Sequence, residues 1–196
     1  KAKIYPLDVL DEIQCSVAIK DFISLPGSVE AVYANAGAGS PDELSSGSSS
    51  AMNRILSINI IGVTNTVMPF IPYMKSIKNG KIAVICSIAS FRGLAHHSAY
   101  SGSKAAVRNI CQGWSTALYK HGISVTAICP GFIKSEMTDN NKFYMPFLMD
   151  TDVAVKKIIR AVDKKRKVFI FPWQMRFFTV PIMKYAPDWI FRKFSI

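Results

Sequence analysis

The sequence has few cysteines, and their spacing gives no sign of a metal or redox site. Four occur among 196 residues, Cys15, Cys86, Cys111 and Cys129. None forms a Cys-x-x-Cys pair, and none lies at metal-ligand spacing from a histidine. Cys86 and Cys129 fall inside strongly apolar runs, which favours buried free thiols in a reducing compartment. We therefore expect neither a structural zinc nor a disulfide framework.

Long apolar runs are also scarce. No stretch of about 18 consecutive apolar residues occurs, so a membrane-spanning helix is not predicted, and no signal peptide is visible. These absences favour a cytoplasmic protein. The first residue is Lys1 rather than methionine, so the sequence is expected to begin inside a longer product or to have been processed or trimmed.

The composition is that of a globular protein with a basic C-terminal quarter. Hydrophobic residues make up 49% of the chain and charged residues 19%. The formal net charge is +11, and residues 151–196 carry 11 Lys or Arg against 3 Asp. The basic cluster at 164–167 has no interleaved aromatic residues, unlike nucleic-acid-binding segments. We therefore expect no nucleic-acid partner and interpret the cluster as a solvated helix end.

Short apolar segments alternate with amphipathic ones along the chain. The expected strands are 3–9, 30–34, 81–87, 123–129 and 168–171, and the expected helices are 11–25, 51–78, 99–120 and 151–165. Pro69 and Pro72 are expected to kink or divide the second helix. Alternation of this kind predicts an α/β fold in which helices cover both faces of a parallel sheet. Such sheets bind ligands at the carboxyl ends of their strands.

Reactive side chains cluster around the predicted end of the third strand. Tyr100 and Lys104 are four residues apart, so they share one helix face. An ammonium group beside a phenol favours the phenolate and lowers its pKa, which suits a group that exchanges protons with a carbonyl or an alcohol. Ser87 ends the strand that precedes this helix, and its hydroxyl can hold a substrate oxygen. Each feature alone is common, and only their order and spacing together point to this chemistry.

Taken together, these motifs resemble the classical short-chain dehydrogenase/reductase family over residues 3–137. The matching positions are Asp8-Val9, Asn35-Ala36-Gly37, Asn59, Ser87, Tyr100-Ser-Gly-Ser-Lys104, and Pro130-Gly131 with Ser135. The resemblance implies a Rossmann-type, doubly wound parallel sheet that binds NAD or NADP. It also implies an oxidoreductase that interconverts a carbonyl and an alcohol.

The resemblance assigns a role to each matching position. Tyr100 would donate or accept the proton, and Lys104 would lower its pKa and bind the nicotinamide ribose. Ser87 would position the substrate oxygen, and Asn59 would support a water that relays protons to Lys104. The residues implied in cofactor binding, besides Tyr100 and Lys104, are Asp8 and Val9 at the adenine, Asn35, Ala36 and Gly37 along the cofactor, and Pro130, Gly131, Ile133 and Ser135 at the nicotinamide.

Three positions depart from the family pattern. Ala34 stands where the family commonly has a first asparagine, and Ser135 replaces a threonine while keeping the hydroxyl. The third departure is larger, because the Gly-rich turn that holds the pyrophosphate is absent from the sequence. We therefore expect that roughly two strands and two helices precede Lys1 in the parent protein. The residue that separates NAD from NADP would lie in that part.

The rest of the chain leaves alternatives open. Residues 1–172 are expected to form one partial catalytic domain, and residues 173–196 a basic, aromatic C-terminal arm. The apolar segment Phe143, Tyr144, Met145, Phe147, Leu148 and Met149 indicates an apolar substrate, or simply a lid packed on the body. The arm is expected to pack on the body or a partner subunit, with an interfacial helix on an anionic membrane as the alternative.

Two other functions stay possible on the sequence alone. A relative without catalytic activity could keep the fold as a binding protein, and a membrane-surface protein could act through its basic arm. The resemblance further implies a homodimer or homotetramer, because helices 51–78 and 99–120 match those that pair across the usual family interface. The small-molecule substrate itself is not readable from the sequence.

Overall fold

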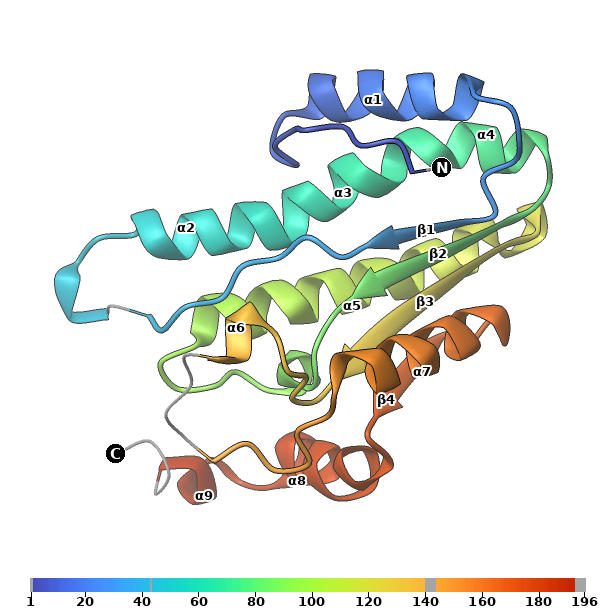
Figure 1. Cartoon of the computed structure of the whole chain (residues 1–196). Helices are drawn as coiled ribbons and strands as arrows, with labels where there is room; N and C mark the ends of the chain where they lie inside the picture. Colours follow the sequence, from blue (N-terminus) through green and yellow to red (C-terminus); the bar gives the residue numbers. More distant parts are fainter. Residues whose placement is uncertain (1, 43, 140–143, 193–196) are drawn as a thin grey trace.

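The computed structural model describes residues 2–42, 44–139 and 144–192 and shows a layered α/β arrangement (Figure 1). Its four strands are β1 (Ala31–Ala34), β2 (Gly80–Ile85), β3 (Ile123–Pro130) and β4 (Val168–Phe171). All neighbouring pairs are parallel, and the order across the sheet is β1-β2-β3-β4. The prediction of a parallel sheet is therefore confirmed.

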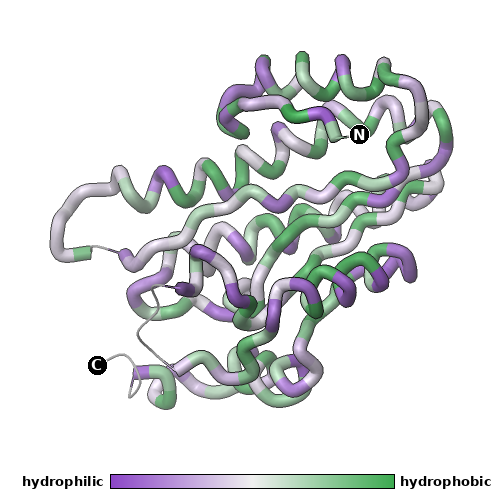
Figure 2. The backbone as a smooth tube through the Cα atoms, in the orientation of Figure 1, coloured by the Kyte–Doolittle hydropathy of each residue, from purple (hydrophilic) through white to green (hydrophobic). Residues whose placement is uncertain are grey.

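Alternating side chains of the central strands supply two separate cores, because successive residues point to opposite faces of a sheet. Ile82 and Val84 of β2 belong to the larger core. Ala83 of β2 and Ile128 of β3 belong to a second core on the opposite face. The central strands are largely hydrophobic, as Figure 2 shows, with Lys81 in β2 and Ser124 and Thr126 in β3 as exceptions, which suits parallel strands covered on both sides.

Helices cover both faces of the sheet, as predicted (Figure 1). The first face carries α1 (Glu12–Ser24), a long helical run composed of α2 (Ser50–Leu56), α3 (Gly62–Val67) and α4 (Ile71–Ser76), and α5 (Ser98–Leu118). The second face carries α7 (Thr151–Asp163). Shorter helices follow β3 and β4, namely α6 (Glu136–Asp139), α8 (Val180–Tyr185) and α9 (Asp188–Arg192).

The long helical run changes its winding twice. Residues Ser57–Ile61 form a π-helical turn, and Met68–Phe70 form a 3₁₀ turn at the predicted Pro69 kink. The run Ser50–Ser76 is long enough and apolar enough to cross a membrane, with a mean hydropathy of 1.5 in its most apolar 18-residue window. In the structure it packs against α5 and β1, as a core helix of an α/β layer does.

The predicted strand at residues 3–9 does not form, so that prediction was wrong. The segment has no regular secondary structure, and Lys3 and Tyr5 instead contact the Asp21 carboxylate of α1. A strand needs a hydrogen-bonded neighbour, and among the described residues β1 pairs only with β2. The outer edge of β1 is thus open to a further strand, and Tyr33 on this strand is 41% exposed.

Candidate active site

Three strand ends bring the predicted site residues to one edge of the sheet, because β1, β2 and β3 run in parallel (Figure 1). Asn35 follows β1, Ser87 follows β2 and Gly131 follows β3. Ser87 is 8% exposed, and its hydroxyl oxygen accepts a hydrogen bond of 3.1 Å from the Ala89 backbone N–H. This bond caps the 3₁₀ turn Ile88–Phe91 and fixes the hydroxyl beyond the strand.

Tyr100 enters this edge from the first turn of α5. Its phenol is close enough to the Ser87 hydroxyl for that hydroxyl to act on the pKa of the phenol. Its ring lies against the backbone of Gly39, where an added Cβ would be only 3.1 Å from the ring carbon Cδ2. Ser87 and Tyr100 therefore lie together at this edge of the sheet.

Lys104 follows one helical turn later and is 4% exposed. Its Nζ donates a hydrogen bond of 2.8 Å to the carbonyl oxygen of Ile85 and lies 5.8 Å from the centre of the Tyr100 ring. Burial lowers the pKa of Lys104, because a buried ammonium loses its hydration. The two side chains share a helix face, as predicted, but the ammonium points to Ile85.

The pKa of Tyr100 differs from the expectation. Burial raises it, and this effect outweighs that of the Ser87 hydroxyl, which lowers it. We expected Lys104 to lower the pKa of the phenol, and the net direction is the opposite. The Lys104 ammonium instead bonds to the Ile85 carbonyl and does not act on the pKa of Tyr100. Tyr100 is consequently protonated at neutral pH.

Asn59 is fully buried inside the π-helical turn and joins two parts of the site. Its Oδ1 accepts from the Ala38 N–H at 2.8 Å, and its Nδ2 donates to the Ala38 carbonyl at 2.9 Å and to Ser103 Oγ at 2.9 Å. Ser103 precedes Lys104 on α5. Asn59 therefore ties the segment after β1 to the helix of Tyr100. Single π-turns in helices frequently occur at functional sites.

The turn Asn35-Ala36-Gly37 is exposed and passes close to the buried amide and ammonium groups. A Cβ at Gly37 would lie 3.2 Å from Asn59 Oδ1 and 3.3 Å from Lys104 Nζ. Only glycine leaves this space free, so the backbone can approach both groups and a ligand can approach the backbone.

The segment after β3 forms the other side of the edge. The Gly131 N–H donates to the Phe171 carbonyl at 2.8 Å, and a Cβ at Gly131 would lie 2.2 Å from Met175 Sδ. Ile133 forms a parallel bridge with Met149, and the exposed Ser135 hydroxyl donates to the Ile133 carbonyl at 3.4 Å. Pro130 closes β3 and is buried.

Comparison with known proteins agrees with this geometry. Residues 1–143 match the family model for short chain dehydrogenases. The chain belongs to the short-chain dehydrogenase family. It is 37% identical over 149 residues to an uncharacterized oxidoreductase of Myxococcus xanthus, covering 76% of this chain and 59% of that protein. It is 29% identical to a 3-ketodihydrosphingosine reductase of Bacteroides thetaiotaomicron, covering 71% and 52%.

A solved structure shows the same fold. A short chain dehydrogenase from Burkholderia cenocepacia in complex with NADP superposes with a TM-score of 0.80 at 20% identity, covering 97% of this chain and 76% of that one. The chain spans between about half and three fifths of the length of the two curated relatives described above. The family assignment predicted from the motifs is confirmed.

Asp8 and Val9 of this short-chain dehydrogenase lie next to α3. The Val9 carbonyl accepts from Asn65 Nδ2 at 2.9 Å, and Val9 Cγ2 would be 2.8 Å from a Cβ at Gly62. Both contacts place the pair beside α3. Asp8 is exposed, and its carboxylate accepts from the Leu10 N–H at 2.9 Å.

Asp42 contributes to the site of this short-chain dehydrogenase although no sequence pattern pointed to it. Its carboxylate accepts hydrogen bonds from the backbone N–H groups of Ser98 and of Ala99, the latter at 3.3 Å. It thereby caps the helix that carries Tyr100. Burial acts to raise the pKa of Asp42, but the hydrogen bonds of Ser98 and Ala99 lower it overall. The cap comes from 56 residues upstream, so no local motif could reveal it.

The four cysteines are free and buried, as predicted. Cys86, Cys111 and Cys129 lie together behind Ser87, and the hydrogen bond with Cys111 is the main cause that raises the pKa of Cys86 to about 12. The hydrogen bond with Cys86 and, to a smaller degree, burial also raise the pKa of Cys129. Such thiols are unreactive at neutral pH. Within the described ranges, no group of three or more His, Cys, Asp or Glu could hold a metal ion.

Proposed function

We propose that this short-chain dehydrogenase is an NAD(P)-dependent oxidoreductase that interconverts a carbonyl and an alcohol, with Tyr100 as its acid/base. The observation that carries the proposal is that the Ser87 hydroxyl and the Tyr100 phenol lie together at the carboxyl edge of the sheet, with Lys104 buried one turn further along α5. A hydroxyl pair at the carboxyl edge of a parallel sheet suits the binding and protonation of a single oxygen atom.

The residues present fit the nicotinamide half of a dinucleotide. The bare backbone at Gly37, between the Asn59 amide and the Lys104 ammonium, leaves a cradle that a Cβ would fill. In our proposal the cofactor is held by Asn35, Ala36, Gly37, Tyr100, Lys104, Pro130, Gly131, Ile133 and Ser135, with Asp8 and Val9 at the adenine. When bound, the nicotinamide supplies or accepts a hydride.

In the proposed reaction, side chains of this protein bind the substrate oxygen and transfer the proton. The Ser87 hydroxyl holds the substrate oxygen, and the Tyr100 hydroxyl gives up its proton as negative charge develops there. A raised pKa keeps Tyr100 protonated near neutral pH, which suits donation to a carbonyl. Lys104, whose ammonium is anchored on the Ile85 carbonyl, binds the ribose. Asn59 holds the cofactor-binding turn on α5, next to the water that relays protons to Lys104.

The proposed substrate is apolar. The segment that follows Ser135 exposes large apolar side chains, including Tyr144 at 87%, Phe147 at 50% and Leu148 at 39%. One similar protein is named for a long-chain substrate, 3-ketodihydrosphingosine. A homodimer is proposed through the long helical run and α5, on which Ile61 and Met68 are each 50% exposed.

Fluorescence titration of the full-length gene product with NADPH and, separately, with NADH tests the proposal. We expect saturable binding of at least one, and loss of that binding in Gly37→Val, whose side chain would fill the cradle. Gly93→Val is the matched control, because a Cβ at Gly93 meets no atom within 4 Å. A folded protein that binds neither nucleotide, or binding that survives Gly37→Val, would contradict the proposal.

A further inference from the structure

The C-terminal arm is anchored to the body by one face. Met175, Val180 and Met183 are 1%, 5% and 7% exposed. The Arg92 guanidinium donates to the carbonyl oxygens of Met183 at 3.1 Å and Ala186 at 2.9 Å. These contacts fix the orientation of the arm, so its opposite face is exposed to solvent.

That outward face is apolar and aromatic. It consists of Trp173, Phe177, Phe178 and Ile182, which are 62%, 61%, 61% and 54% exposed, and we call it the aromatic face. The rings of Trp173 and Phe178 lie 6.4 Å apart, so these side chains form a continuous surface. Clustered exposure of large apolar side chains marks an interaction site.

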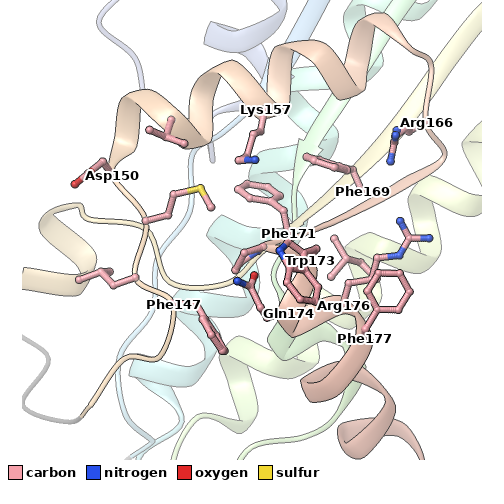
Figure 3. Close-up of a pocket in the computed structure, with 15 residues that line it drawn as sticks. Phe147, Asp150, Lys157, Arg166, Phe169, Phe171, Trp173, Gln174, Arg176 and Phe177 are labelled. Carbon is pink, nitrogen blue, oxygen red and sulfur yellow. The ribbon is translucent and has the colours of Figure 1, made fainter.

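A positively charged groove adjoins the aromatic face. Its volume is about 570 Å³, and it lies between α7, β4 and the π-helical turn Met175–Thr179 (Figure 3). Trp173 and Phe177 of the aromatic face line it, together with the cations Lys157, Arg166 and Arg176. In Figure 3, Lys157 projects from one wall, and Arg176 lies beside Phe177 on the other.

The charge of the groove is not neutralised by the chain. Among the described residues that line the groove, Asp150 is the only acidic one, and its carboxylate pairs with Lys134 at 2.6 Å. In the described part of the chain, no ion pair involves Lys157, Arg166 or Arg176. The groove is therefore a site for anionic groups beside an apolar surface.

We infer that the aromatic face and the adjoining groove dock onto an anionic lipid surface. Exposed Trp and Phe side chains insert at the boundary between headgroups and acyl chains, and neighbouring Lys and Arg side chains reach lipid phosphates. The wider surroundings have the same sign of charge, since residues 151–196 carry 11 Lys or Arg against 3 Asp. A second copy of the chain is a poorer partner, because it would bring the same unpaired cations together.

The surface also has a consequence for the proposed reaction. Phe147 and Leu148 line the groove and belong to the segment proposed to cover the substrate. Docking therefore brings that segment to the lipid, from which an apolar substrate can enter. This step alone rests on the proposed function, and the binding test below does not depend on it.

Vesicle sedimentation of the full-length gene product tests the inference. The vesicles are phosphatidylcholine alone, or phosphatidylcholine with about 30% phosphatidylserine, at 0.1 M salt. We expect binding to the anionic vesicles, at least tenfold weaker binding to the neutral ones, and loss of binding at 0.5 M salt, since salt screens the attraction.

Variants assign the binding to this surface. Phe177→Ser with Phe178→Ser should lower binding at least tenfold, and Arg176→Gln should lower it about fivefold, as expected for one basic residue near an anionic membrane. The matched control is Ile13→Ser with Val17→Ser on α1, whose side chains are 77% and 62% exposed. This control should bind like the unmodified protein. Circular dichroism confirms that each variant is folded.

Three outcomes would overturn the inference. The first is unchanged vesicle binding in the folded Phe177→Ser, Phe178→Ser variant, or no vesicle binding at all. The second is a concentration-dependent dimer that this variant abolishes, which would make the face an interface between copies. The third is binding of monomeric dodecanoate that is as tight as vesicle binding and is not displaced by added vesicles. This result would assign the groove to a soluble ligand.

Discussion

Replacement of Asn59 by alanine tests whether the buried amide joins the two halves of the site. The substitution removes three hydrogen bonds of 2.8 to 2.9 Å from a side chain with no exposed surface. It also leaves the N–H and the carbonyl of Ala38 without those partners. At about 1 kcal/mol for each bond, the free energy of unfolding should fall by about 3 kcal/mol.

Thermal unfolding followed by circular dichroism measures this effect. For a protein of this size, about 3 kcal/mol corresponds to a fall in Tm of roughly 6 to 12 °C. Asn53→Ala is the control, because Asn53 is exposed on the same helical run and makes one bond of 3.3 Å to Ser49 Oγ. It should lose less than about 0.5 kcal/mol. Equal melting temperatures for the two variants would refute the reasoning.

Three further variants test the fold and the cap of α5. Gly122→Ala would place a Cβ 2.2 Å from the Lys78 carbonyl oxygen at a φ of +74°, so we expect the free energy of unfolding to fall by about 1 to 3 kcal/mol. An unchanged denaturant unfolding curve would contradict this. Gly113→Ala adds a Cβ in open space inside α5 and should stabilise by about 0.5 to 1 kcal/mol, whereas a lowered Tm would count against the assigned geometry. Asp42→Ala removes the cap of α5 and should lose about 1 kcal/mol at pH 7. The folded protein lowers the pKa of Asp42 below 3.8, so this stabilisation is present above pH 3.8 and is lost as the pH falls further. A stability difference between Asp42→Ala and the unmodified protein that persists unchanged at pH 2 would exclude the cap.

Local sequence patterns predicted most of the helices and strands, because the spacing of apolar residues reflects which faces of each element are buried in the fold. The apolar run 81–87 became β2 within one or two residues, and the run 123–129 became β3. Residues 3–9 contain Pro6 and Asp8 and have no neighbouring strand, so their apolar residues were not sufficient to form a strand. The π-helical turn at Asn59 was also missed, since one extra residue in a helical turn leaves no clear mark on the apolar spacing.

The contacts of the candidate site, too, were predicted only in part from the sequence. The motif order predicted that Ser87 and Tyr100 meet, because strand ends and the following helix start converge at one sheet edge. It did not predict the Lys104 bond to the Ile85 carbonyl, since the rotamer of a buried lysine depends on tertiary contacts. The cap from Asp42 to α5 was equally invisible, because it joins segments far apart in the sequence.

Turnover by Tyr100→Phe in the full-length gene product tests the central claim most directly. The variant removes one hydroxyl and keeps the ring against Gly39. With NAD(P)H and a panel of apolar ketones and aldehydes, we expect kcat to fall by at least about 100-fold, the usual contribution of general acid catalysis, while NAD(P)H binding is kept. Tyr33→Phe, at a 41% exposed position on β1, should leave kcat unchanged. Turnover retained by Tyr100→Phe would contradict the account.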